Sequence, residues 1–164
     1  MAADDKSQNG AAKTPQEASI QVLGQYIKDL SFENPSAPQS FQQQPPNPKL
    51  DINFGVGVRE VGPNVHEVTL NVENKLATEK QVLFQLQLDY AGAFRIEGLP
   101  PELLHQVLHV QCPTLLFPFV RRLVADLTRD GGFPQLYLDP IDFAALYRMQ
   151  MARSQGTQPQ AMQA

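Results

Sequence analysis

The chain of 164 residues contains no tryptophan and only one cysteine, Cys112. One thiol cannot form an internal disulfide, so packing has to hold the fold together, and a lone cysteine suits a reducing cytoplasm. Basic residues are also scarce, because 13 Lys and Arg stand against 17 Asp and Glu, for a net charge of −4. Nucleic-acid binding requires clustered Lys and Arg that neutralise phosphates, so we expect no nucleic acid as partner.

Long apolar runs are missing as well. The longest, at 115–120, contains a proline and falls far short of the roughly 20 residues that span a bilayer. The N-terminus is acidic where a secretory signal would be basic and then apolar. We therefore expect a cytoplasmic protein with no membrane insertion.

The remaining composition suits one globular domain, since 42% of residues are hydrophobic and 18% are charged. Small and polar residues fill both ends, which predicts flexible tails at 1–17 and 152–164 around a single domain at 18–151. A proline-rich stretch at 33–48 is expected to cross between elements in an extended conformation.

Apolar side chains occupy alternate positions in four runs, which predicts four strands between about residues 20 and 96. Three runs alternate cleanly, at 50–58, 68–72 and 82–90. The first run is less regular, because Leu23 and Ile27 break the alternation. Turn residues between the runs favour consecutive antiparallel hairpins.

After the strands, apolar residues recur at spacings of three and four, which predicts a helix at about 101–130 that Pro118 should kink. A second helix is predicted at about 141–151, with Asp142 as its N-cap or, alternatively, with a start at Asp139. The sequence thus predicts an α+β fold, in which helices pack on one face of a four-stranded antiparallel sheet.

Two blocks of the sequence resemble a known family: YIKDLSFENPSAP at 26–38, and CPTLLFPFVRRL followed by GGFPQLYLDPIDFAALY within 112–147. They are similar to the signature blocks of the SecB family of bacterial protein-export chaperones, and the likeness covers about residues 18–150. The resemblance implies a homotetramer, a dimer of dimers with helices between two outward-facing sheets. It also implies a holdase that binds unfolded precursor proteins in the cytoplasm, keeps them translocation-competent and delivers them to the SecA translocase ATPase.

Asp29 and Glu33 lie four residues apart on the first predicted strand, so the two carboxylates share a face. Such a pair could steer a basic partner, although a solvated strand face is the simpler explanation. The resemblance implies that these residues contact SecA. The family often has an acidic residue where this chain has Gln87, which predicts weaker or differently distributed SecA binding.

The apolar, proline-broken segment at 112–147 favours a binding groove over a catalytic site. The candidates to line a client groove come from the crossover, the linker after the first helix and the last helix: Phe41, Phe133, Leu136, Tyr137, Phe143, Leu146, Tyr147 and Met149. Each of them could equally be a core residue. Holding an unfolded client requires only preferential binding to the unfolded state, so no cofactor is expected.

The apolar side of the last predicted strand consists of Leu86, Leu88 and Tyr90. The resemblance implies that this region, with the kinked helix, packs between subunits. The alternative is that the three residues belong to the core of one chain.

One group of residues could carry chemistry: His105, His109 and Cys112, spaced four and three apart on a helix, as zinc ligands can be. A zinc-dependent hydrolase is therefore conceivable. A second metal-binding pair and the usual zinc motifs are missing from the sequence, however, as is a nucleophile with a supporting base. We expect no bound metal and no enzymatic activity, and a small-molecule or lipid carrier that uses the same groove stays open as an alternative.

Overall fold

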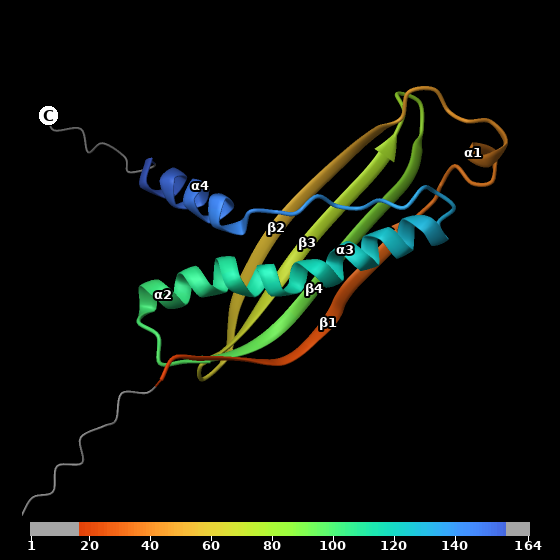
Figure 1. The fold of residues 1–164 in the computed structure, drawn as a ribbon. Coiled ribbons are helices and arrows are strands. Elements are labelled where there is room, and N and C mark those ends of the chain that lie inside the picture. The colour runs from red at the N-terminus through yellow and green to blue at the C-terminus, as the bar shows by residue number, and fades with distance from the viewer. Residues whose placement is uncertain (1–16, 157–164) are drawn as a thin grey trace, which may run out of the picture.

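The computed structural model describes residues 17–156. It shows a four-stranded antiparallel sheet in the order β1-β4-β3-β2, with helices on one face (Figure 1). The elements are β1 (Ser19–Glu33), α1 (Gln39–Gln42), β2 (Lys49–Gly62), β3 (Val65–Ala77), β4 (Val82–Glu97), α2 (Pro101–Gln106), the π-helical turn η1 (Val107–Gln111), α3 (Cys112–Asp130) and α4 (Phe143–Gly156). The predicted α+β architecture is confirmed.

The central strands β3 and β4 carry most of the core. Their even-numbered apolar side chains face the helices and are almost fully buried: Val68, Leu70, Val72, Leu86 and Leu88. The edge strands β1 and β2 are far more exposed along their length. A two-residue loop joins β2 to β3, and its Asn64 has a φ of 57°, a left-handed conformation that Asn tolerates.

Strand β1 contains two β-bulges, which explain its irregular sequence pattern. The register with β4 shifts once between Val22 and Gly24 and again between Ile27 and Asp29. Each bulge adds one residue, so the side chains between the two bulges exchange faces. Tyr26, an even-numbered residue expected on the inner face, therefore lies on the outer face, while its neighbour Gln25 points inward and accepts a hydrogen bond from Tyr90.

The helical layer is one long helix, formed by α2, η1 and α3 over Pro101–Asp130. Within η1 the hydrogen bond from Cys112 N reaches back to Val107 O, a spacing of five residues. We attribute this wider turn to the next residue, Pro113, because proline has no N–H to continue an α-helical ladder. By length and composition the helix could span a membrane, but its apolar face packs on β3 and β4.

An extended linker at 131–142 leads from α3 back across the inner side of the sheet to α4 (Figure 1). Gly131 N donates to Leu127 O at the end of α3. Asp142 caps α4 as predicted, since its Oδ1 accepts from Ala145 N at 2.9 Å. α4 extends to Gly156, beyond the expected end at residue 151, and the rest of both predicted tails, at 1–16 and 157–164, lies outside the described residues.

Thr128 attaches this linker to α3. Its buried Oγ1 donates to Val124 O at 2.9 Å and accepts from Leu136 N at 3.0 Å. Thr128→Val keeps the shape but leaves the Leu136 N–H without its acceptor, so we expect a loss of about 1–3 kcal/mol in the free energy of unfolding. Urea titration at a fixed protein concentration measures it.

Thr114→Val is the matched control, because the exposed Thr114 hydroxyl only donates to Val110 O on its own helix. We expect that variant to stay within about 0.5 kcal/mol of the parent. Equal losses in both variants would contradict the role given to Thr128.

Candidate functional site

The outer face of the sheet is open and acidic at one end. Asp29 lies opposite Asp89 in the β1–β4 register, and both carboxylates border a hollow of about 320 Å³ with Glu73 and Gln87. Glu33 follows four residues later on the exposed edge of β1. The two carboxylates predicted to bind SecA are thus both exposed, and Asp29 is joined by two further acidic residues.

The other end of this face is neutralised by an ion-pair cluster around Glu67. The carboxylate accepts hydrogen bonds from Lys28 Nζ and Tyr26 OH at 2.5 Å each and from Arg59 at 3.0 Å. The bonds from Lys28 and Tyr26 lower the pKa of Glu67 to about 2, against the opposing effect of burial. Glu67 is therefore engaged within the sheet, and the free negative charge lies around Asp29.

The predicted groove residues at the crossover end form an aromatic cluster. The Phe133 ring lies 4.9 Å from that of Phe84 and 5.9 Å from that of Phe41, measured between centroids. A Cβ on Gly132 would meet the Phe41 ring at 2.8 Å, and the φ of Gly132 is +86°, so this glycine allows the ring to approach. Phe41 is 53% exposed and can contact a partner.

A second set of predicted groove residues lies on α4, at the other end of the linker from the aromatic cluster. Phe143 is only 3% exposed and packs edge-on against Phe117, so the prediction that it contacts a client is wrong and it belongs to the core. Leu146 and Met149 are 39% and 54% exposed. Tyr147 is half-buried against the rings of His105 and His109.

Tyr137 is a third predicted groove residue, and it lies on the linker between the aromatic cluster and α4. It is 59% exposed and lies under the Arg121 guanidinium, 5.6 Å from the ring centroid. Beside it is a hollow of about 450 Å³ between α3 and the linker. Leu136, the preceding residue, is half-buried against the core. The expected groove residues are thus distributed along one path and do not surround a single pocket.

The residues predicted for the subunit interface are buried inside one chain. Leu86 and Leu88 are 0% and 1% exposed and Tyr90 is 8% exposed, so they have almost no area left to bury against another copy. The intrachain alternative describes them correctly. The Tyr90 ring stacks on that of Phe119, with centroids 6.1 Å apart, and Phe119 is 42% exposed.

The zinc-ligand hypothesis does not fit the structure. Cys112 is 0% exposed and packs inside the apolar core, whereas His105 is exposed, and burial raises the pKa of the Cys112 thiol to about 12. Over residues 17–156, no three His, Cys, Asp or Glu side chains are placed to hold a metal ion.

A comparison with protein-family models matches residues 13–154 to the family described as preprotein translocase subunit SecB. The chain belongs to the SecB family. It is 50% identical over 154 residues to protein-export protein SecB of Bradyrhizobium diazoefficiens, which covers 94% of each chain. It is 51% identical over 151 residues to the same protein of Afipia carboxidovorans, which covers 92% of each.

A solved structure shows the same fold. The SecB-like chaperone of Mycobacterium tuberculosis, in complex with an antitoxin peptide, aligns with a TM-score of 0.60 at 19% identity, over 74% of this chain and 90% of that one. At this identity the likeness concerns the SecB fold alone.

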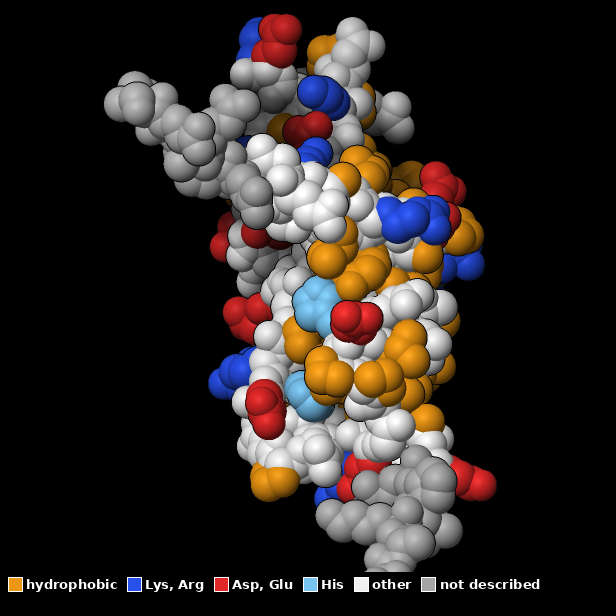
Figure 2. Space-filling model, turned by 90° about the vertical axis from the view of Figure 1, so that its left-hand side faces the viewer, with side chains coloured by type: hydrophobic (Ala, Val, Ile, Leu, Met, Phe, Trp, Pro, Cys, Tyr) orange, Lys and Arg blue, Asp and Glu red, His pale blue; other side chains and the backbone are white. Residues whose placement is uncertain are grey.

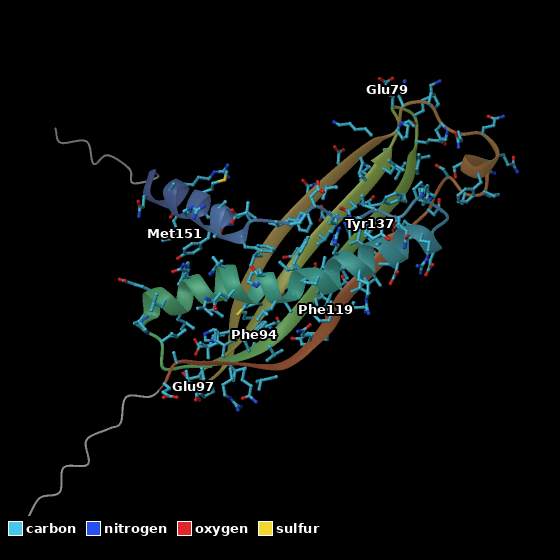
Figure 3. The ribbon with its side chains drawn as sticks, in the orientation of Figure 1. Glu79, Phe94, Glu97, Phe119, Tyr137 and Met151 are labelled. Atoms are coloured by element: carbon cyan, nitrogen blue, oxygen red, sulfur yellow. The ribbon has the colours of Figure 1, made fainter. Side chains whose placement is uncertain are left out.

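Sequence reasoning missed an exposed apolar surface that this SecB-family chain carries beside its core. On α3, Leu115 and Phe119 are 48% and 42% exposed, and on β1, Leu23 and Ile27 are 43% and 46% exposed. We call these four residues the β1–α3 patch. Figure 3 shows Phe119 on the side of α3 opposite Tyr137. The signal was available, because Leu23 and Ile27 are the residues that break the alternation of their strand.

Glu67→Gln should destabilise the protein at neutral pH, because Lys28 and Arg59 lose their shared carboxylate; we expect a loss of about 1–3 kcal/mol. The folded-state pKa is depressed, so this stabilisation is present above the ordinary value of 4.5 and is lost as the pH falls towards 2. Urea unfolding from pH 7 to pH 3 should show the parent and the variant converging below pH 4.5.

Glu73→Gln serves as the control, since Glu73 is exposed on the same strand and face. A loss of the same size in that variant would mean that general surface charge, and not the Glu67 cluster, sets the effect.

Proposed function

We propose that this chain is a holdase that captures unfolded precursor proteins in the cytoplasm and passes them to the SecA ATPase. Membership of the SecB family of protein-export chaperones supports the proposal. The observation that carries it is the row of exposed apolar side chains along the crossover, linker and α4: Phe41, Tyr137, Leu146 and Met149.

The arrangement of this row suits an extended polypeptide. The linker at 131–142 runs between the aromatic cluster at α1 and the exposed side of α4 (Figure 1). A client laid along it could bury apolar side chains at several separate places, each worth about 25 cal/mol per Å². Burial of this kind needs no sequence motif and no nucleotide, and the flexible thioether of Met149 adapts to different clients.

The β1–α3 patch is the proposed contact between copies in a homotetramer. Its apolar side chains lie on both an edge strand and the helical layer, so one surface could extend the sheet and pack helix against helix. Several copies would place several apolar paths within reach of one long client, which increases avidity.

The proposed SecA contact is the acidic end of the outer sheet face, with Asp29 and Glu33 on β1. Asp89 and Glu73 add to the negative charge around Asp29. Their carboxylates compensate for the missing negative charge at Gln87, which lines the same hollow. This face lies opposite the helices, so SecA and a client can occupy the chain together.

The holdase activity is tested by diluting a denatured, slow-folding precursor into buffer with and without the protein, in the absence of ATP. We expect slower refolding without aggregation. The triple variant Phe41→Asp, Tyr137→Asp, Met149→Asp should bind the client at least about tenfold more weakly, a change of about 1.4 kcal/mol.

The control is Val61→Asp, which places one carboxylate of the same kind on a side chain that is 49% exposed near the C-terminal end of β2. Its client affinity should match that of the parent. Unaltered refolding in the presence of the parent protein, or a purified protein that retains a single metabolite in place of polypeptide, would contradict the proposal.

The SecA contact is tested with Asp29→Asn, Glu33→Gln. We expect weaker binding to SecA and a smaller dependence of that binding on salt, because two carboxylates are lost, while client affinity stays the same. Titration calorimetry at two salt concentrations measures both.

Glu97→Gln, at the end of β4 and at the opposite end of the sheet from Glu33 (Figure 3), removes one charge outside the acidic end and should leave SecA affinity unchanged. An equal loss of SecA and client binding in the Asp29, Glu33 variant would contradict the assignment.

A further inference from the structure

Helix α4 is held on the rest of the fold through a small contact. Among the helices and strands its principal neighbour is η1. Phe143, at its first turn, is buried in the core, but most of the residues after it are exposed. One turn after Phe143, Tyr147 makes the contact with the α2–η1 segment. The contacts that Tyr147 makes with α2 and η1 therefore hold the rest of α4 against the fold.

Tyr147 meets two stacked histidines. The rings of His105 and His109 lie 4.2 Å apart between centroids with an interplanar angle of 30°, and the Tyr147 ring lies 5.5 and 5.9 Å from them. Tyr147 OH is 2.8 Å from His105 Nδ1, and His109 Nδ1 is 2.8 Å from His105 O. A carbonyl oxygen only accepts, so His109 Nδ1 carries the proton in that bond. We call these three residues the His–Tyr cluster.

The cluster suits neutral imidazoles. Burial, followed by the proximity of His109, lowers the pKa of His105 below its ordinary value of 6.5. Stacking at 4.2 Å is favourable for two neutral rings but repulsive for two imidazolium ions, because like charges at this distance disfavour each other. Figure 2 shows hydrophobic side chains next to the histidine atoms and one acidic side chain beside the larger group of them.

Little negative charge is available to offset added protons. The titratable and charged groups nearest in sequence on the helices packed against η1 are Glu102 on α2, Cys112 at the start of α3, and Tyr147, Arg148 and Arg153 on α4. On the strands packed against η1, His66 and its cross-strand partner Glu60 share the inner face, whereas the other charged residues of β2 and β3 have odd numbers and lie on the outer face. The remaining charged residues of α3 begin at Arg121, more than two turns beyond Cys112. The β2 residues beside His109, at 54–56, carry no charge. α4 contains two arginines and no Asp or Glu, so protonated histidines would face a cationic helix with one carboxylate, Glu102, on their own side.

We propose that protonation of the His105–His109 pair releases α4 from η1, which makes the docking of this helix sensitive to acid. At pH 7.5 α4 is docked through Tyr147. As the pH falls, the two rings acquire charge next to each other and next to a cationic helix, and the contact separates. Phe143 stays in the core, so the rest of the fold is retained.

The experiment uses the absence of tryptophan from the chain. Gln150→Trp places one reporter on α4, beside the small hollow that His109 and Tyr147 also line. Between pH 8 and pH 5 we expect its emission to shift to the red and acrylamide quenching to rise at least twofold, with a midpoint below pH 6.5. Above pH 5 exposed carboxylates remain ionised, which limits the titration to histidine.

The comparison is the same reporter in His105→Gln, His109→Gln, which should show no transition in this range. A reporter at Lys80→Trp, on the β3–β4 turn, should also stay constant, because the fold does not change. A flat response of the parent reporter, an unchanged transition in the double variant, or an equal transition at Lys80→Trp would each overturn the proposal.

If α4 is already undocked at pH 8 in the His105→Gln, His109→Gln variant, a second variant tests whether histidine protonation releases the helix. His109→Phe keeps an aromatic ring in the stack and leaves one imidazole, so the charge that lowers the pKa of His105 is lost. The midpoint should move upward and the change in quenching should become smaller. A curve identical to that of the parent would overturn the proposal.

A consequence for clients rests on the proposed function, since α4 carries Leu146 and Met149 of the apolar row. Acid release would remove this part of the row, so client affinity should fall at pH 5.5 in the parent but not in the double variant. If no client binds at any pH while the reporter still titrates, the holdase proposal fails and the release of α4 stands.

Discussion

One helix has to bury the apolar inner face of four strands. The α2–η1–α3 helix packs on the central strands β3 and β4, where Leu70, Leu86 and Leu116 are completely buried. A helix with its side chains is about 10 Å across, whereas four strands spaced about 4.8 Å apart form a wider surface. The edge strands and the outer side of the helix are therefore left with exposed apolar side chains. The surfaces available for clients and for other copies follow from this incomplete cover.

The alternation of apolar and polar residues predicts the strands that have to bury one face. It does not predict where an inserted residue changes the face to which the side chains point. Strict alternation located β2, β3 and β4, and the carboxylate of Asp142 located the start of α4. The two bulges in β1 were not predictable as such, because alternation alone does not tell an inserted residue from a broken pattern. They place Tyr26 on the outer face, where it binds Glu67.

The candidate site was predicted less well than the fold, for a physical reason. Phe41 and Phe143 are the same residue type and both were candidates for the groove, yet one is 53% exposed and the other 3%. The difference comes from what lies over each ring, namely the path of the crossover and the edge of α3, which are tertiary features. Leu86 and Leu88 were ambiguous in the same way, and the single covering helix is sufficient to bury them.

The linker at 131–142 shows how a segment without regular secondary structure can still present side chains reproducibly. Thr128 accepts from the N–H of Leu136, and Arg121 Nε donates to the carbonyl of Leu138 at 2.9 Å. Both bonds come from α3, so the linker is fixed at Leu136 and at Leu138, the residues immediately before and after Tyr137. Leu136 and Leu138 turn to the core, and in an extended chain the residue between them must point away from it. The exposure of Tyr137 thus follows from two hydrogen bonds to a rigid helix, which leaves the aromatic ring ordered but available to a partner.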